Sequence, residues 1–192
     1  MSAQNQNDEW QLWWDARQAA FEAILGPADD HVFHALIPFY LGGYADVLQF
    51  HPRGMGVAYV TSDLIGDDGQ INNELGNYEL MICVRSEANL APNLISRLAR
   101  YTLEAQLRPW ETMDIGPALP EGSTLSALTF VPHAKFIVRG RDCGLLLCLG
   151  ITQEEFQVYH AHGPAIVVDR LKQNGVFPFS DLSRGSVPLP RC

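Results

Sequence analysis

Four short segments rich in β-branched and aromatic residues follow one another in the first half of the chain, separated by glycine- or proline-bearing turns. Such segments are typical of β-strands. Because neighbouring strands joined by short links tend to pair with each other, this order predicts an antiparallel or mixed sheet. The four predicted strands are residues 31–40, 45–51, 57–64 and 77–85, and the last of them, NYELMICVR, has the clearest pattern.

Helical patterns surround these strands and extend the prediction to the whole chain. Residues 9–25 repeat apolar side chains every three or four positions and end at a Gly-Pro stop, with Trp13, Phe21 and Ile24 expected in the core. A partner surface made by the three tryptophans of this segment is the alternative to core packing. Two further helices are predicted at residues 92–107 and 165–173, and another after Thr152, where Thr-Gln-Glu-Glu has the form of a capping box. Two more strands are predicted at residues 135–138 and 144–149, forming a hairpin.

Together these elements predict an α+β fold, a mixed β-sheet packed with helices. No segment has the composition of a long linker, so we expect a single domain over residues 8–187. Residues 1–7 and 188–192 are expected to be flexible termini.

The charge of the chain limits its partners. Its 192 residues include 22 acidic and 13 basic side chains, which gives a formal net charge of −9. Such a surface repels phosphate backbones, so it argues against nucleic acid and favours a basic protein partner. The polar amino terminus does not have the pattern of a secretion signal, and no apolar run is long enough to span a bilayer. We therefore expect a cytoplasmic protein without a membrane partner.

The four cysteines fit a reducing compartment. If residues 143–148 form one strand, the odd separation places Cys143 and Cys148 on opposite faces of the sheet. These two cysteines could then neither form a disulfide with each other nor share a metal ion. We expect reduced and mostly buried thiols.

Catalytic and metal-binding motifs are missing from the sequence. It has no Gly-x-Ser-x-Gly, Cys-x-x-Cys or His-Glu-x-x-His pattern. We therefore predict no catalytic residue, no metal site and no cofactor. His160 and His162 keep two alternatives open. One is a hydrolase or another enzyme of unknown chemistry, and the other is a zinc site completed by a distant cysteine.

A set of acidic residues is the main candidate for binding. Asp63, Asp67, Asp68 and Glu79 lie in and around the third and fourth predicted strands. One interpretation is an acidic rim beside an exposed sheet edge, which would hold a basic peptide by strand addition. The other is a solvated loop, because Asp-Asp-Gly is a plain turn sequence.

Aromatic and arginine side chains form a second group. Arg97, Arg100, Tyr101 and Trp110 lie in or just after the second predicted helix and are of types enriched at interfaces, although half-buried structural roles are the alternative. The arginines at positions 139 and 141 flank a glycine and would suit an anion nest or a plain turn between strands.

Several segments, in this order, resemble the suppressor of fused (SUFU) domain family, over nearly the whole chain. No single segment is decisive, and the resemblance depends on their common order. The segments are Ile24-Leu25-Gly26, Leu41-Gly42-Gly43, Tyr59 to Asp67, Tyr78-Glu79-Leu80, Leu98-Ala99-Arg100-Tyr101, Gly150 to Glu155, and Asp181 to Ser186.

The resemblance implies a non-enzymatic protein-binding module. The animal member is larger and holds zinc-finger transcription factors of the Gli type through an extended peptide, whereas small bacterial members resemble immunity proteins that neutralise toxins. This chain is about the size of the amino-terminal domain alone, so Gli-type binding is not expected. Asp67 and Glu79 match acidic positions of the peptide cleft, and with Asp63 and Tyr59 they form the predicted partner-binding set. A self-associating structural domain is the remaining alternative.

Overall fold

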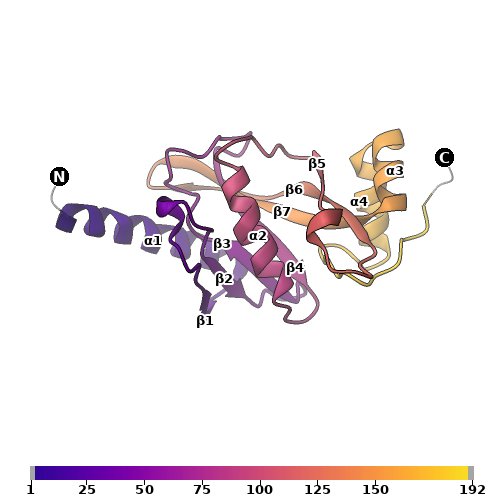
Figure 1. Cartoon of the computed structure of the whole chain (residues 1–192), viewed down its shortest axis with the longest axis horizontal. Helices are drawn as coiled ribbons and strands as arrows, with labels where there is room; N and C mark the ends of the chain where they lie inside the picture. Colours follow the sequence, from indigo (N-terminus) through magenta and orange to yellow (C-terminus); the bar gives the residue numbers. More distant parts are fainter. Residues whose placement is uncertain (1–2, 190–192) are drawn as a thin grey trace.

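Residues 3–189, which the computed structural model describes, form one seven-stranded mixed sheet with helices on both of its faces (Figure 1). The predicted α+β class and single domain are confirmed. The strand order is β1-β2-β3-β4-β7-β6-β5, and only the pair β4–β7 is parallel. The strands are β1 Ala28–Phe33, β2 Val47–Phe50, β3 Val57–Thr61, β4 Asn77–Val84, β5 Thr112–Asp114, β6 Leu125–Val138 and β7 Arg141–Thr152.

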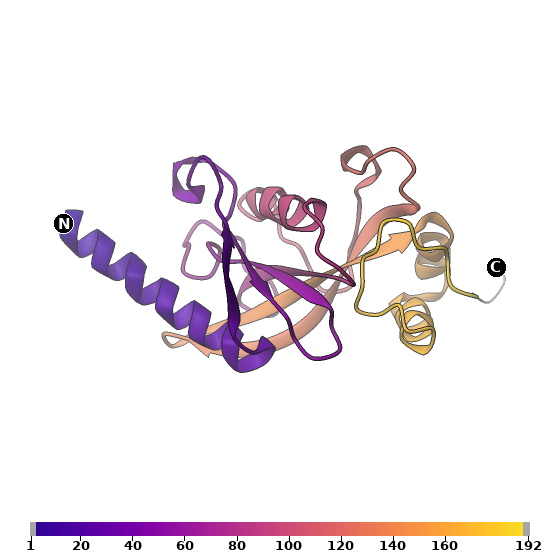
Figure 2. The ribbon, with the colours of Figure 1, turned by 90° about the horizontal axis from the view of Figure 1, so that it is seen from below.

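The helices gather at the two ends of the long hairpin β6–β7, with one helix across the middle of the sheet. Both views place α1 at one end and α3 with α4 at the other (Figures 1 and 2). The predicted capping box is confirmed, because the Thr152 side chain accepts the N–H of Glu155 while Glu155 accepts the N–H of Thr152. The helices are α1 Ala3–Leu25, α2 Leu90–Tyr101, α3 Gln153–His162 and α4 Pro164–Gln173, with short 3-10 helices η1 Phe39–Leu41 and η2 Gly116–Ala118.

The two faces of the sheet carry separate hydrophobic cores. One core joins the sheet to α1, α3 and α4 and includes Phe21, Met81 and Cys143. The other joins the sheet to α2 and includes Ile95 and Cys148. The prediction that the two cysteines of β7 point to opposite faces is therefore confirmed, as the two-residue period of a strand requires.

The first predicted strand, residues 31–40, was wrong over its last seven residues. Strand β1 ends at Phe33, and residues 34–44 fold into a compact loop. Pro38 begins a tight turn in which its carbonyl accepts the N–H groups of Leu41 and Gly43. Gly42 has a φ of 90°, a conformation that favours glycine. These turn residues override the apolar pattern of the segment.

Predicted boundaries elsewhere also shifted. The second helix ends at Tyr101, six residues before its predicted end, and β5 and η2 follow it. Helix α1 begins at Ala3, and its predicted core residues Trp13 and Ile24 are half-buried, while Phe21 is fully buried. Of the predicted flexible termini, residues 1–2 and 190–192 lie outside the described part of the chain.

The segment after α4 closes the sheet where β4 and β7 diverge. Phe179 forms an isolated parallel bridge with Cys83, and the Ser180 N–H donates to the Cys83 carbonyl. On the other side the Ser180 hydroxyl accepts the N–H of Gly150 and donates to the Cys148 carbonyl. The segment thus links β4 and β7 beyond Met81 and Leu147, the last residues at which the two strands pair with each other.

Candidate functional site

The four predicted partner-binding residues do not form one surface. Tyr59 is 1% exposed and belongs to the core beneath α2, where its ring packs edge-on against Phe33. Glu79 is fully buried, on the opposite face of the sheet. The acidic rim predicted to include Glu79 is therefore not present, because this side chain turns inward.

Glu79 has a structural role instead, because its carboxylate is surrounded by hydrogen-bond donors. Its carboxylate accepts the N–H groups of Leu64 and Ile65, each at 2.8 Å, and the hydroxyl of Thr61 at 2.6 Å. Burial raises the pKa of Glu79 to about 7, although the Arg17 charge and these hydrogen bonds oppose the increase. The carboxylate thus fixes the loop that leaves β3, and this loop carries the two remaining predicted residues.

Asp63 and Asp67 do come together, in a pocket between α1, η1 and this loop. The pocket has a volume of about 150 Å³. We call it the acid–aromatic pocket, and it is lined by Trp10, Trp13, Arg17, Phe39, Tyr40, Asp63, Gly66 and Asp67.

The walls of the acid–aromatic pocket are partly open to solvent. Tyr40 is 76% exposed and Trp10 45% exposed, and the Trp10 ring stacks on Trp14 at a centroid distance of 5.4 Å. Gly66 is needed where Trp13 approaches, because a Cβ there would lie 2.8 Å from the indole. The pocket therefore offers aromatic faces beside two carboxylates.

Arg17 sets the electrostatics at the base of this pocket. It is 4% exposed and donates to the Ile65 carbonyl at 2.6 Å, while its Nε and Nη2 atoms have no hydrogen-bond partner among the described residues. Burial raises the pKa of Asp63, and the carboxylates of Asp46 and Asp67 act in the same direction. The Asp46 N–H, which donates to the Asp63 carboxylate at 2.7 Å, and the Arg17 charge oppose this increase.

Sequence reasoning found the two carboxylates of this pocket, but for the tryptophans of its aromatic wall it favoured core packing over a partner surface. Trp10, Trp13 and Arg17 follow the helical spacing that was interpreted as a core stripe. Tyr40 was assigned to a strand that the turn at Pro38 replaces. A signal for this wall was present in Trp10, Trp13 and Trp14, because their i, i+3, i+4 spacing places three tryptophans on one face of α1.

A free sheet edge lies elsewhere on the molecule. Strand β5 pairs with β6 at Ala127, Leu128 and Thr129. Two main-chain bonds extend this contact to Phe130, whose carbonyl accepts the Trp110 N–H and whose N–H donates to the Glu111 carbonyl. Among the described residues, no strand pairs with the outer edge of β6 beyond that point. Trp110 marks the start of the free edge with a φ of 68° and a 43% exposed side chain.

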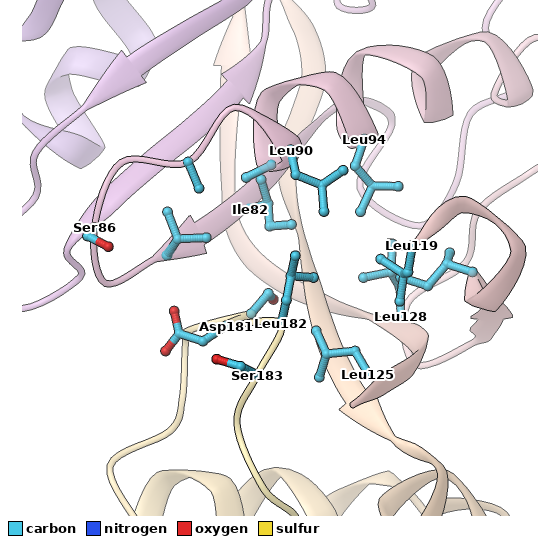
Figure 3. A pocket seen from close by; sticks show the side chains of 15 residues that line it. Ile82, Ser86, Leu90, Leu94, Leu119, Leu125, Leu128, Asp181, Leu182 and Ser183 are labelled. Carbon is cyan, nitrogen blue, oxygen red and sulfur yellow. The ribbon is translucent and has the colours of Figure 1, made fainter. Parts of the chain in front are cut away.

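An apolar pocket lies between the start of α2, η2 and the carboxy-terminal segment (Figure 3). Its volume is about 230 Å³, and its walls are mainly leucine and isoleucine side chains such as Ile82, Leu94 and Leu128. Its one carboxylate, Asp181, forms an ion pair with Arg85 at 2.9 Å. The lining offers no acid–base pair for catalysis.

The histidines of the enzyme alternative lie apart from every pocket described above. His160 and His162 are exposed on α3, and the His160 ring lies 3.1 Å from the Thr112 hydroxyl. Within residues 3–189, no three His, Cys, Asp or Glu side chains form a group that could hold a metal ion. In the same range, no helix has the length and hydropathy needed to cross a bilayer.

The cysteines are buried as predicted. Cys83, Cys143 and Cys148 are free thiols in the interior. Burial raises the pKa of Cys83 to about 12 and that of Cys143 to about 11. Thiols in such surroundings are unreactive. Cys192 lies outside the described residues.

Comparison with known proteins identifies the fold. A solved structure described as a SUFU homologue from Neisseria gonorrhoeae shares 17% identity with a TM-score of 0.65, covering 94% of this chain and 97% of that one. A chain of the Sufu–Fu complex shares 12% identity with a TM-score of 0.70, covering 92% and 91%. Drosophila Suppressor of Fused shares 13% identity with a TM-score of 0.68, and its match covers 90% of this chain but 49% of that protein, so this chain spans about half of its length. At these identities the likeness shows the fold alone.

The sequence itself gives the family. A search of curated proteins found no match. The sequence model of the family described as "Suppressor of fused protein (SUFU)" matches residues 45–185, which is most of the chain. This range holds four of the seven segments on which the resemblance depended, and a fifth except for its last residue, Ser186. The chain therefore belongs to the suppressor of fused family.

Proposed function

We propose that this chain is a non-enzymatic, cytoplasmic protein-binding module that holds a basic segment of its partner in the acid–aromatic pocket. The pocket itself carries the proposal, because it joins exposed faces of Trp10 and Tyr40 to the carboxylates of Asp63 and Asp67. A lysine or arginine inserted there would gain cation–π contacts worth about 1–2 kcal/mol together with charge-assisted hydrogen bonds.

Two further observations support a basic protein partner. The net charge of −9 would steer a cationic partner toward the chain. The Sufu–Fu complex contains a protein of the same fold assembled with another protein. We propose an immunity-type role, in which the module binds a toxin and neutralises it within the cell.

An extended segment of the same partner has a place to pair. The outer edge of β6 beyond Phe130 leaves main-chain groups without a strand partner among the described residues. Edges of this kind accept an added strand. The exposed indole of Trp110 at the start of the edge supplies an apolar anchor of a type common at interfaces.

The decisive experiment co-expresses the chain with the protein encoded by the neighbouring gene. We expect a stable complex in affinity purification, with an affinity that falls as salt rises, because exposed ion pairs are screened. Replacing Asp67 by lysine should weaken binding about tenfold in calorimetry. Asp68→Lys is the matched control, because Asp68 lies one residue away, outside the pocket, and forms an ion pair with Arg141.

The outcomes separate the function from its site. Absence of any complex with the neighbouring protein at low salt would reject the binding function. A complex that tolerates Asp67→Lys as well as Asp68→Lys would keep the function and remove the pocket from it. Trp10→Ala gives a second check, because it removes an exposed ring of the pocket without changing its charge.

A further inference from the structure

A second, larger groove lies between the loop after β1 and helix α2. It has a volume of about 910 Å³. One wall is built from residues 31–37 and 42–44, and the other from the helix side chains of Asn93, Ser96, Arg97 and Arg100. We call it the arginine groove. It is distinct from the acid–aromatic pocket, and the two share no lining residue.

The charge of this groove is opposite to that of the chain. Its lining contains two arginines and two histidines, His31 and His34, and no aspartate or glutamate, although the chain carries 22 acidic side chains. Within residues 3–189, neither Arg97 nor Arg100 forms an ion pair with a carboxylate. An acidic chain thus keeps a local cationic surface at this groove.

The two guanidinium groups are held in place by aromatic rings. The Arg97 guanidinium lies 5.7 Å from the centre of the Tyr44 ring, and that of Arg100 lies 5.7 Å from the centre of the Phe39 ring. Three residues apart on α2, the two arginines share one face of the helix. A guanidinium stacked on a ring keeps its N–H edges available for a carboxylate.

Large apolar side chains surround the same groove. Leu36 is 104% exposed, Ile37 56% and Tyr44 47%, and all three line it. Leu41, in the adjoining turn, is 65% exposed. A contiguous exposed patch of this kind marks an interaction surface.

The groove is formed before any partner arrives. The Ser96 hydroxyl donates to the Ala45 carbonyl at 2.5 Å, and the Ala45 N–H donates to the Ser96 carbonyl. The carboxylate of Asp46 holds the opposite wall, because it accepts the Ala35 N–H at 2.8 Å and contacts the His34 ring at 2.7 Å. Walls fixed in this way lose little conformational entropy on binding.

We infer that the arginine groove binds an acidic segment of a partner protein that also carries apolar side chains. The carboxylates of the segment pair with Arg97 and Arg100, and its apolar side chains cover Leu36 and Ile37. Concavity favours a peptide over a membrane surface, because the arginines line a groove instead of a protruding tip. This inference rests on the protein-binding function proposed above, but it uses a different surface and a partner segment of opposite charge.

A displayed library of short random peptides tests it. Selection is run on the wild-type chain, on the double variant Arg97→Glu/Arg100→Glu, and on Arg53→Glu/Arg170→Glu, which changes two exposed arginines outside the groove. A salt concentration of about 150 mM limits repulsion from the net charge. We expect wild type and the control to enrich peptides that combine acidic and apolar residues. Fluorescence anisotropy should show at least about tenfold weaker binding of these peptides to the groove variant.

Two further variants test the apolar part of the arginine groove and the independence of the groove from the acid–aromatic pocket. Leu36→Ser/Ile37→Ser should weaken binding of the selected peptides, whereas Asp67→Lys should leave their affinity unchanged. Circular dichroism confirms that each variant is folded. If no basic partner binds at the acid–aromatic pocket, the peptide selection at the arginine groove is therefore unaffected. If the peptide selection fails, binding of a basic partner at the acid–aromatic pocket is likewise unaffected.

Three results would overturn the inference. The first is the enrichment of basic or uncharged peptides, or equal enrichment on the Arg97→Glu/Arg100→Glu variant. The second is a dimer in sedimentation equilibrium that this variant abolishes, since the groove would then hold a second copy of the chain. The third is binding to phosphatidylserine vesicles that the variant abolishes, without any peptide selected.

Discussion

Single residues of this fold show how burial decides what a charged side chain does. Glu79 and Asp67 were both predicted to face a partner, yet Glu79 is fully buried and Asp67 lies at an open pocket. Three hydrogen-bond donors surround the Glu79 carboxylate, from Thr61, Leu64 and Ile65. Glu79 therefore acts on the site indirectly, by fixing the loop that carries Asp63 and Asp67.

The burial of Glu79 predicts a pH-dependent stability. Its pKa is raised from 4.5 to about 7, so the folded state binds this proton more tightly than the unfolded state does. Its contribution is complete below about pH 4.5 and is lost as the pH rises toward 7. A Glu79→Gln variant keeps the uncharged form at every pH. Its unfolding free energy in urea, relative to wild type, should rise by up to about 3 kcal/mol between about pH 5 and pH 8.

The exposed Glu74 supplies the control for this measurement. The difference between Glu74→Gln and wild type should stay constant over the same pH range. A constant difference for Glu79→Gln as well would show that Glu79 does not titrate in this interval. Attraction between the Arg17 charge and the ionised Glu79 carboxylate lowers the pKa of Glu79, so it reduces the expected change and does not cause it.

At the residue scale the sequence predicted types of contact better than it predicted exposure. The opposite orientations of Cys143 and Cys148 follow from the strand period alone. For Tyr59 and Glu79 the same period predicts which side chains of a strand share a face. It does not predict whether helices cover one face of that strand or both. Here helices cover both faces of the central strands, so an acidic residue at position 79 is enclosed.

At the scale of elements, the most accurate predictions were those with strong local signals. Strand β4 and the capping box at Thr152 were both found from short patterns. Strand β6 was predicted over four residues and has 14, because Pro132 interrupts its pattern. A register shift between Pro132 and Ala134 absorbs that proline, and only the partner strand β7 makes this possible. Long-range pairing of this kind leaves no local signal.

Glycine at position 76 is required by the contact between the loop before β4 and the strand β7. Gly76 has a φ of 88°, and a Cβ there would overlap the carbonyl oxygen of Asp142. Gly140, in the β6–β7 turn, has a similar φ of 80° with open space around it. We expect Gly76→Ala to reduce the unfolding free energy by about 3 kcal/mol and Gly140→Ala by about 1 kcal/mol, measured in urea. Equal losses would show that the loop moves away from β7 without cost.

At the scale of the whole molecule, two surfaces of opposite character lie on one small fold. The acid–aromatic pocket uses α1 and the loop after β3, and the arginine groove uses α2 and the loop after β1. Composition favours only the first of them, since a net charge of −9 is consistent with an acidic pocket and gives no indication of the arginine groove. Both depend on loops that the sheet brings together, which explains why the sequence indicated some of their residues without indicating the sites.

The carboxy-terminal segment joins the two halves of the sheet, and one buried ion pair anchors it. The Arg184 guanidinium contacts the Glu155 carboxylate at 2.7 Å, with the Glu155 side chain fully buried and that of Arg184 9% exposed. The same carboxylate accepts the N–H groups of Thr152 and Val187, each at 3.0 Å. Glu155 thus connects the start of α3 to the end of the described chain.

Removing Arg184 should therefore destabilise the whole fold and not only its last residues. Arg184→Ala leaves the Glu155 charge buried without its partner, and we expect a loss of about 3–5 kcal/mol in urea unfolding. Arg85→Ala breaks the other ion pair of the segment, Arg85–Asp181, and since the Arg85 side chain is 53% exposed the expected loss is about 1 kcal/mol or less. The double variant Glu155→Gln/Arg184→Met should recover part of the loss, because it removes both charges. If Arg184→Ala and Arg85→Ala cost the same, the segment would be a surface attachment, and the join between β4 and β7 would have to depend on Phe179 and Ser180 alone.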